Sequence, residues 1–346
     1  MNATGGAFIE YPLSSPSVSQ RVLLTGAFGG IGQEALRHLL ANGHSVNCMD
    51  LPNPKNKKAA RQFSDRVNVI WGDICNLDTL GHTLQGIDVV IHMAAVLPPL
   101  ANMDIARATV VNVEATRHLI TLMEGSVTAK RLIFASSIGI AGKAQHLRTP
   151  PLTVEEPPAP SDHYGMTKAQ CETLIKASAI DWTILRIAAC PHAGLLKGNL
   201  DAFRLIFDTS ADGRVEFVHF DDAGLAFANA VSCNETIGKT LFIGGGARCQ
   251  TNAWSFYNSL FREMGLGPLP RAAFCPGQPL FFGDWLDTRE SQELLKFQHH
   301  SLEEFYVWLR THMGLKRYFF RALSPLINRV LLRQSPYLQT EASGKK

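Results

Sequence analysis

The sequence lacks the features that mark several protein classes. Its seven cysteines are scattered and no two form a C-x-x-C pair, so neither a disulfide framework nor a zinc site is predicted, and no metal is expected. Neither sign of charge dominates, because 33 basic residues are nearly balanced by 30 acidic ones and the net charge is +3. A nucleic-acid partner is therefore not expected, since that usually needs a concentrated basic face.

Long apolar runs are missing as well. No uninterrupted run approaches the roughly 18–20 residues needed to cross a bilayer. Residues 1–20 have neither the basic start nor the apolar stretch of an export signal, and we expect them to form a flexible leader. Because the cysteines are expected to be reduced and no export signal is present, the predicted location is the cytoplasm. The 46% hydrophobic content is enough for the core of a soluble enzyme.

From residue 21 the chain alternates short β-like runs with helical stretches. Such alternation predicts an α/β fold with a doubly wound parallel sheet of the Rossmann type, covered by helices on both faces. The expected strands cover residues 21–26, 45–50, 67–71, 87–92, 131–135 and 182–186, and the expected helices cover 30–42, 103–123 and 162–179. Further along, 221–231 and 252–264 are helical candidates and 239–243 is strand-like.

A glycine-rich turn joins the first strand to its helix. The segment Thr25-Gly26-Ala27-Phe28-Gly29-Gly30-Ile31-Gly32 follows a strand and opens a helix, as a dinucleotide-binding fingerprint requires. Its glycines permit a tight turn, close approach of a pyrophosphate and close helix–strand packing, while the helix N-terminus faces the phosphates. We predict that the cofactor contacts Gly26, Phe28, Gly29, Gly30, Ile31 and Gly32.

Asp50 ends the second strand, eighteen residues beyond Gly32. A carboxylate there can accept hydrogen bonds from the ribose hydroxyls of NAD and would repel a 2′-phosphate, so NAD is the predicted cofactor. NADP is the alternative, because the basic cluster Lys55, Lys57 and Lys58 follows closely. The plainer interpretation of Asp50 is a loop aspartate that starts a turn.

Tyr164 and Lys168 stand four residues apart in a predicted helix and therefore share one face. A free tyrosine has a pKa of about 10, and a nearby cation lowers it, so that the phenol can exchange a proton with a substrate oxygen. The pair follows a fifth strand that ends in Ser136-Ser137, where a hydroxyl could polarise the same oxygen.

At this point the chain resembles the extended branch of the short-chain dehydrogenase/reductase superfamily, which includes nucleotide-sugar epimerases, 3β-hydroxysteroid dehydrogenases and dihydroflavonol reductases. The resemblance runs from about residue 20 to about 310. Four further segments have the spacing of the family: Gly72-Asp73-Ile74, His92-Met93-Ala94-Ala95, Asn112-Val113-Glu114-Ala115-Thr116 and Val218-His219-Phe220-Asp221-Asp222.

The resemblance implies roles for single residues. Ser137, Tyr164 and Lys168 become a catalytic triad, and Asn112 becomes its supporting fourth member. Ser137 is preferred to Ser136, for which a hydrogen-bonded strand-end hydroxyl is an equal alternative. Cofactor contacts are implied for Asp73, Ile74, Ala94, Ala95, Tyr164 and Lys168.

The resemblance also implies an organisation. Residues 21–188 would form the dinucleotide-binding domain and 189–314 mainly a smaller substrate-binding lobe interleaved with it. We expect a homodimer that acts on a small-molecule substrate.

Two positions depart from the sugar-nucleotide enzymes of the family. Ala189 replaces a polar residue, and Val215 stands where a diphosphate-binding arginine is common, although Arg214 could compensate if the register slips. The departures favour a more apolar substrate. Candidate pocket residues, each of which fits the core better than a pocket wall, are Leu97, Pro98, Leu100, Leu195, Leu196, Phe203 and Phe207.

The tail, residues 315–346, begins with a basic amphipathic segment. Residues 315–338 hold five basic residues and no acidic one, mixed with leucines and aromatics. Such a segment can lie in a membrane interface, or it can pack as a helix on the body or on a second subunit. His192, His299 and His300 are interpreted as surface or capping histidines, since no carboxylate stands near them at metal-ligand spacing.

The expected reaction is hydride transfer between nicotinamide and a carbon that bears oxygen. The leading hypothesis is interconversion of a secondary alcohol and a ketone on a steroid-like molecule or secondary metabolite, with Tyr164 as general acid/base. A nucleotide-sugar epimerase or dehydratase with transient hydride transfer is the alternative. A non-catalytic cofactor-binding regulator is a third hypothesis, which the intact Ser137, Tyr164 and Lys168 argue against.

Overall fold

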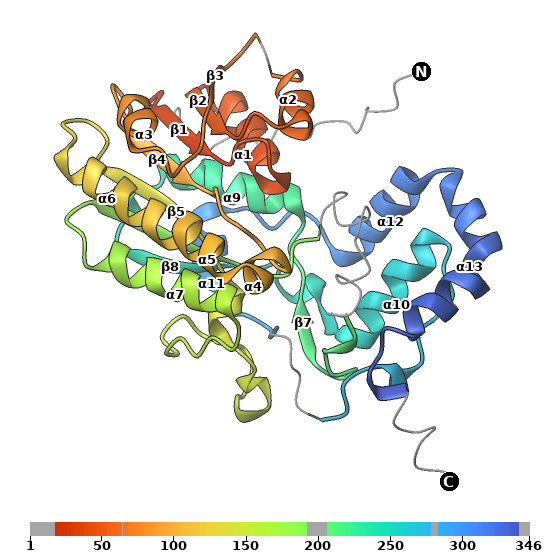
Figure 1. Cartoon of the computed structure of the whole chain (residues 1–346). Helices are drawn as coiled ribbons and strands as arrows, with labels where there is room; N and C mark the ends of the chain where they lie inside the picture. The colour runs from red at the N-terminus through yellow and green to blue at the C-terminus, as the bar shows by residue number, and fades with distance from the viewer. Residues whose placement is uncertain (1–17, 64, 192–205, 278–282, 339–346) are drawn as a thin grey trace.

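The computed structural model describes residues 18–63, 65–191, 206–277 and 283–338. Most of the expected leader, together with His192, Leu195, Leu196 and Phe203, lies outside these residues. Figure 1 shows the described chain as a sheet flanked by helices, with a second group of helices beside it that includes α10, α12 and α13.

A seven-stranded sheet forms the centre of the molecule, with strand order β3-β2-β1-β4-β5-β6-β8 and every neighbouring pair parallel. The order reverses between β1 and β4, as a doubly wound Rossmann sheet requires. The six expected strands are all present, and the strand-like segment 239–243 is the seventh. Their bounds are β1 Arg21–Thr25, β2 Ser45–Asp50, β3 Asn68–Trp71, β4 Val89–His92, β5 Arg131–Ser137, β6 Asp181–Ile187 and β8 Lys239–Ile243.

Helices cover both faces of this sheet. One apolar core joins the sheet to α1 (Gly30–Ala41) and α9 (Phe220–Ser232), and the other joins it to α3 (Leu77–Thr83), α6 (Ala115–Gly125) and α7 (His163–Lys176). Gly224 lets α1 and α9 touch, because a Cβ there would lie 2.6 Å from the backbone nitrogen of Ala35. Two short helices lie on the surface: α2 (Pro54–Ala60) and α11 (Arg289–Leu295).

The long helix expected over 103–123 is interrupted. The chain forms α4 (Leu100–Met103) and α5 (Ile105–Ala108), separated by Asp104, whose side chain accepts the backbone N–H of Arg107. A π-helical segment, η1 (Thr109–Glu114), then precedes α6. Such wide turns often occur at functional sites, and this one carries Asn112.

Parts of the 189–314 segment belong to the main sheet and its helical cover. Strand β8 completes the edge of the main sheet beside β6, and α9 packs on α1, although both come from the 189–314 segment. The rest of that segment forms the lobe with a small antiparallel sheet, β7 (Arg214–Glu216) and β9 (Gln250–Asn252), and the helices α10 (Ala253–Met264) and α12 (Leu302–Met313). Helix α13 (Lys316–Leu332) packs on α10 and α12.

Candidate active site

The glycine turn lies at the carboxyl edge of the sheet, between β1 and α1. Gly26 has φ +69°, and a Cβ there would lie 2.9 Å from the backbone nitrogen of Ala94. At Gly32 a Cβ would lie 2.3 Å from the carbonyl oxygen of Gly26. Gly29 is the N-cap of α1 and brings no side chain to its first N–H groups. The turn therefore leaves a close-approach cradle and a helix N-terminus, which suit a pyrophosphate.

Asp50 is tied directly to this turn. One carboxylate oxygen accepts the backbone N–H of Phe28 at 2.8 Å, and the other accepts N–H groups of Leu51 and Asn56, both at 2.8 Å. Burial raises the pKa of Asp50, and these hydrogen bonds oppose the rise. The same carboxylate thus closes the local loop and stands beside the turn, and its contact with the cofactor ribose stays a prediction.

The remaining predicted cofactor residues lie along the same edge. Asp73 follows β3 and accepts the backbone N–H of Cys75 at 2.9 Å, while Ile74 is buried beside it. Ala94 follows β4, and its N–H reaches the hydroxyl of Thr25 at 3.2 Å, next to half-buried Ala95. These residues thus follow β3 and β4 at the same carboxyl edge of the sheet as the glycine turn, and those after β4 lie at the point where the strand order reverses.

Helix α7 brings Tyr164 and Lys168 to the end of β5. The phenol of Tyr164 interacts with the hydroxyl of Ser137. The ammonium of Lys168 donates to the carbonyl of Ala135 at 2.7 Å and lies 4.7 Å from the centre of the Phe134 ring. The ammonium is 5.8 Å from the centre of the Tyr164 ring. All three predicted triad residues are thus together.

The expectation that Lys168 lowers the pKa of the phenol is wrong for this arrangement. Burial raises the pKa of Tyr164 above its usual value, and the interaction with Ser137 opposes this only in part. Burial also lowers the pKa of Lys168 to about 8, against the attraction of Cys171 and Glu172. Desolvation outweighs charge here because both groups are inside the protein. With these groups alone, the phenol keeps its proton at neutral pH.

The two adjacent serines have different partners. The hydroxyl of Ser136 donates to the carboxylate of Glu172 at 2.6 Å, and the same carboxylate forms a bidentate ion pair with Arg186 at 3.0 and 2.8 Å. Neighbouring strand residues point to opposite faces, so Ser137 points away from this buried pair and toward Tyr164. The strand-end alternative therefore describes Ser136, and Ser137 remains the residue placed for chemistry.

Asn112 joins the loop after β4 to α7. Its side-chain oxygen accepts the N–H of Val96 at 2.7 Å, and its amide donates to the carbonyl of Val96 at 3.1 Å and to the hydroxyl of Thr167 at 3.2 Å. Thr167 in turn donates to the carbonyl of Tyr164 at 2.8 Å. The π-helical segment thus aims Asn112 at the turn of helix that carries the phenol.

Sequence reasoning missed a buried histidine that links the cofactor turn to this asparagine. His92 Nδ1 lies 2.7 Å from the hydroxyl of Thr25, and Nε2 lies 3.0 Å from the hydroxyl of Thr116, which donates to the carbonyl of Asn112 at 2.6 Å. Because Thr116 gives its proton to Asn112, it must accept from His92 Nε2–H. Burial and the charge of Lys168 lower the pKa of His92 to about 3. Three of the recognised motifs supply the four members of this hydrogen-bonded chain: the glycine turn gives Thr25, the segment after β4 begins with His92, and the third motif gives both Asn112 and Thr116.

A cavity lies beyond Ser137, between the end of the sheet and the lobe. It is lined by Ile138, Gln145, Ala188, Ala189, Thr209, Gly213, Arg214, Val215, Glu216, Phe256, Tyr257, Gly283 and Asp284. Both predicted departures, Ala189 and Val215, line it. Phe207 does not, because it is buried in the core of the lobe, while Leu97 and Leu100 are exposed after β4 and Pro98 is half-buried.

The guanidinium of Arg214 is already ion-paired where it lines this cavity. Its Nε donates to Asp284 Oδ1 at 2.6 Å, and one terminal nitrogen donates to Asp284 Oδ2 at 3.2 Å and to the carbonyl of Gln145 at 2.7 Å. The buried carboxylate of Glu216 lines the same space, and burial raises its pKa. The described lining thus carries one cation against two carboxyl groups.

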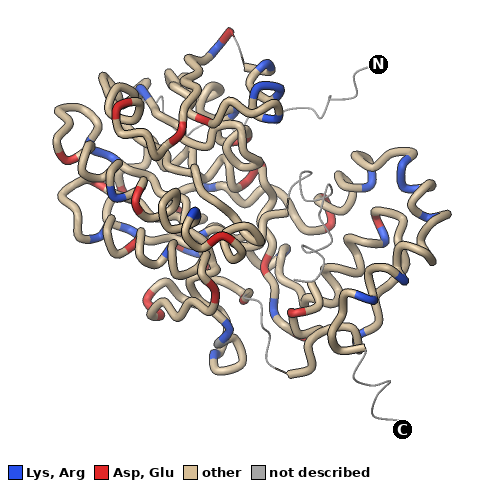
Figure 2. Tube along the Cα trace, in the orientation of Figure 1, with Lys and Arg blue, Asp and Glu red and all other residues tan. Residues whose placement is uncertain are grey.

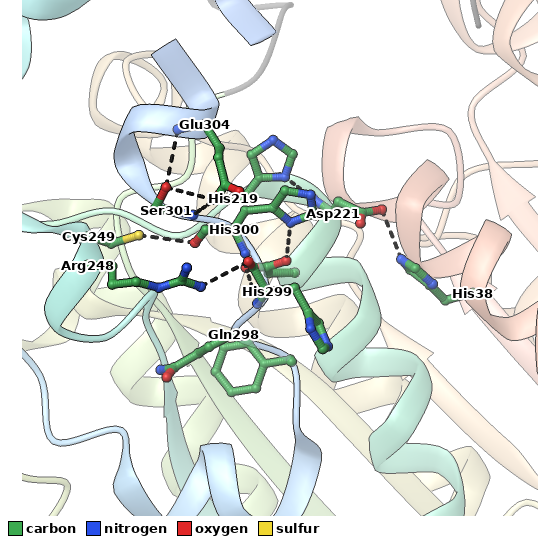
Figure 3. Close-up of polar contacts among 12 residues, drawn as sticks. His38, His219, Asp221, Arg248, Cys249, Gln298, His299, His300, Ser301 and Glu304 are labelled. Atoms are coloured by element: carbon green, nitrogen blue, oxygen red, sulfur yellow. Dashed lines mark hydrogen bonds and ion pairs between the residues drawn. The ribbon is translucent and has the colours of Figure 1, made fainter. Parts of the chain in front are cut away.

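A second polar cluster joins α9 to the start of α12 (Figure 3). His300 Nδ1 lies 2.5 Å from Asp222 Oδ1, and Asp222 Oδ2 accepts the backbone N–H groups of His299 and His300. The ring of His219 stacks on that of His300 with centres 4.2 Å apart. For His300 the sequence spacing offered no carboxylate, and α9 supplies one from 78 residues away. Ligand atoms of His219, Asp222 and His300 lie within 4.8 Å of one another.

The sheet, the glycine cradle and the Ser–Tyr–Lys cluster define the class of a dinucleotide-dependent dehydrogenase/reductase of the extended short-chain type. Residues 22–231 match the model of the NAD dependent epimerase/dehydratase family. This covers more than half of the chain, so the protein belongs to that family, whose cofactor is the NAD that the glycine turn and Asp50 predicted.

Curated relatives include steroid-metabolising enzymes. The chain is 24% identical over 202 residues to a 3-beta-hydroxysteroid dehydrogenase of Mycolicibacterium neoaurum, covering 57% of this chain and 53% of the relative. It is 25% identical over 202 residues to the human decarboxylating sterol-4-alpha-carboxylate 3-dehydrogenase, covering 58% and 51%. The matches thus span about half the length of these relatives.

Solved structures with the same fold include sugar-nucleotide enzymes. A UDP-glucuronic acid 4-epimerase from Bacillus cereus, solved with UDP-glucuronic acid and NAD, is 25% identical with a TM-score of 0.68, covering 84% of this chain and 99% of the epimerase. A UDP-glucose 4-epimerase from Thermotoga maritima is 18% identical with a TM-score of 0.68, covering 85% and 100%. Similarity at this level extends over the sheet and the lobe together.

Proposed function

We propose that this enzyme interconverts a secondary alcohol and a ketone on a fairly apolar small molecule, by net hydride transfer to or from NAD. The observation that carries the proposal is the ion pair between Arg214 and Asp284, which neutralises the only cation of the described cavity lining. A sugar diphosphate brings about two negative charges and would meet two carboxyl groups there. A steroid-like or secondary-metabolite substrate needs few polar anchors.

In this proposal Tyr164 gives its proton to the substrate oxygen during reduction and removes it during oxidation. Ser137 donates a hydrogen bond to the same oxygen, since its hydroxyl already interacts with the phenol. Lys168 holds its ammonium beside both groups through the carbonyl of Ala135. Asn112 positions α7, through Thr167, relative to the loop after β4.

The residues present fit NAD. A pyrophosphate can approach the backbone at Gly26 and Gly32, where a Cβ would leave no room. Asp50 stands beside this turn and would accept hydrogen bonds from the ribose hydroxyls. When bound, the nicotinamide supplies the carbon that accepts or gives the hydride. Lys55, Lys57 and Lys58 are exposed on α2, so NADP is tested beside NAD.

A nucleotide-sugar epimerase is the second candidate, and the likeness in fold to UDP-sugar epimerases over most of the chain favours it. Epimerisation by transient hydride transfer returns the cofactor to its starting state. A cofactor-binding regulator that has lost catalysis is a weaker third candidate, because Ser137, Tyr164 and Lys168 stand together.

The test is turnover of the purified chain with NAD or NADP and a panel of steroid alcohols, other secondary alcohols and UDP-sugars. Net oxidation produces the absorbance of reduced nicotinamide in proportion to ketone, and we expect it with apolar alcohols. A changed UDP-sugar without that absorbance would establish the epimerase instead. Cofactor binding with neither change would establish the regulator.

The proposal extends to assembly and location. Exposed apolar side chains of Met103, Ile105, Val110 and Met166 gather on the contacting segments α4, α5, η1 and α7, and they support a homodimer interface there. No helix in the described parts of the chain is long and apolar enough to cross a membrane. We propose a cytoplasmic enzyme whose segment 315–338 touches the membrane from one side, which suits a lipophilic substrate.

A further inference from the structure

Helix α13 has an apolar outer face. Phe319, Leu323, Leu326 and Val330 recur at intervals of three and four residues, so they share one side of the helix, and Leu315 extends the row. Leu315 is 85% exposed, Phe319 66% and Leu326 61%. These five residues are here named the α13 stripe. A contiguous exposed apolar row of this kind marks an interaction site rather than a scatter of surface leucines.

The inner face of α13 is firmly attached to the lobe. Leu331 is buried in the aromatic core of the lobe, and the hydroxyl of Ser324 accepts the backbone N–H of Gly267 at 2.8 Å. The backbones also meet, because a Cβ at Gly265 would lie 2.2 Å from the carbonyl oxygen of Arg317. The alternative of a helix packed on the body is thus correct for one face only, and that packing fixes the stripe outward.

Charge identifies what covers the stripe. Residues 315–338 contain five cations and no carboxylate, and the trace in Figure 2 is coloured blue for Lys and Arg at several places along this part of the lobe. Helical spacing puts Lys316, Arg329 and Arg333 beside the stripe, and all three are exposed. If two copies paired stripe to stripe, these cations would face each other with no carboxylate of the segment between them. Anionic lipid headgroups would instead neutralise them.

We propose that the α13 stripe docks on a membrane surface that contains anionic lipid, with the helix lying in the plane of the interface. The apolar side chains would enter the boundary between headgroups and acyl chains, and the long basic side chains would reach the phosphates. Tyr318, 60% exposed, is of the type that settles at this depth. This deepens the membrane contact of the proposed function by naming its surface and its lipid chemistry.

The experiment is flotation of the full-length chain with phosphatidylcholine vesicles, with and without phosphatidylglycerol. We expect binding to the anionic vesicles that weakens as salt is raised. Phe319→Gln/Leu326→Gln should lower this partitioning at least tenfold, because each apolar contact is worth roughly that factor. Lys316→Gln/Arg329→Gln should lower it by a similar amount, at roughly fivefold per charge.

Matched controls come from elsewhere on the surface. Val127→Gln removes a 92% exposed apolar side chain that follows α6, and Lys57→Gln/Lys58→Gln removes two exposed cations of α2. Neither should change flotation. All substituted side chains are exposed, and thermal unfolding checks that each variant is folded.

Three outcomes would overturn the proposal: no binding to anionic vesicles, equal binding to neutral ones, or equal losses in the controls. Conversion of a dimer to a monomer by Phe319→Gln/Leu326→Gln with unchanged flotation would assign the stripe to a second copy. Flotation needs no turnover, so failure here is distinct from failure of the oxidoreductase proposal, which is measured without vesicles.

Discussion

The chemistry end and the substrate end of this site use charge and hydrogen bonds in opposite ways. At the chemistry end, a chain of buried hydrogen bonds runs from Thr25 through His92 and Thr116 to Asn112, beside the helix that carries Tyr164. At the substrate end, Arg214 and Asp284 satisfy each other. The buried chain at the first end supports the paired hydroxyls of Ser137 and Tyr164, which are placed for chemistry, whereas the second end pairs its cation with a carboxylate.

The largest expected effect is at the chemistry end. Tyr164→Phe removes the proton donor and should lower turnover by about 10²–10⁴-fold, the usual range for a general acid/base. Because the phenol touches Ser137 and not the glycine turn, NAD binding should stay within about twofold, as measured by calorimetry. Loss of NAD binding together with turnover would show that the variant is misfolded or that Tyr164 is not the acid.

The next effect separates a glycine needed for the cofactor from one needed only for a turn. Gly26→Ala places a Cβ 2.9 Å from the Ala94 nitrogen, whereas Gly43→Ala has a similar positive φ and no atom within 4 Å. Both should cost about 1 kcal/mol of folding stability or more. Only Gly26→Ala should weaken NAD binding, by tenfold or more. Equal NAD affinities in the two variants would show that the turn at Gly26 is not the site where the pyrophosphate of NAD binds.

The buried histidine chain predicts a pH dependence of stability. The pKa of His92 is lowered to about 3, against an ordinary value of 6.5, so between these values the unfolded chain binds a proton that the folded chain does not. Stability is therefore complete above pH 6.5 and falls as pH falls, by about 2 kcal/mol between pH 6.5 and 5.

Urea unfolding of wild type and His92→Gln at several pH values measures this directly. The wild type should lose more stability on acidification than the variant. Burial lowers the pKa of His219 to about 3 as well, but that histidine is present in both proteins and cancels in the comparison. Parallel pH profiles would mean that His92 is not held neutral in the folded chain by burial and the charge of Lys168.

The sequence predicted the chemistry end better than the substrate end. The alternating apolar runs predicted all six expected strands, and the glycine turn, Tyr164 and Lys168 are local patterns whose spacing fixes their geometry. Arg214 and Asp284 are 70 residues apart, and Asp222 and His300 are 78 apart, so no local pattern pairs them. The π-helical turn at Asn112 was also missed, because its apolar spacing differs little from that of an ordinary helix.

One correction came from energetics rather than position. Tyr164 and Lys168 lie where their spacing placed them, yet burial raises the pKa of the phenol instead of leaving the ammonium to lower it. A sequence gives the spacing of two ionisable groups, but it does not show how far each group is removed from water in the folded chain. The same limit applies to Asp50, whose ties to Phe28 and Asn56 depend on the folded turn.

The central claim is that Asp284 neutralises Arg214 and so closes the substrate end to anions. Its most direct test is calorimetric binding of UDP to the NAD-saturated wild type, to Asp284→Asn and to Asp284→Asn/Arg214→Met, each checked for folding by circular dichroism. The account predicts no measurable binding by the wild type, binding by Asp284→Asn, and loss of that binding in the double variant. Tight binding of UDP by the wild type, or none by a folded Asp284→Asn, would contradict it.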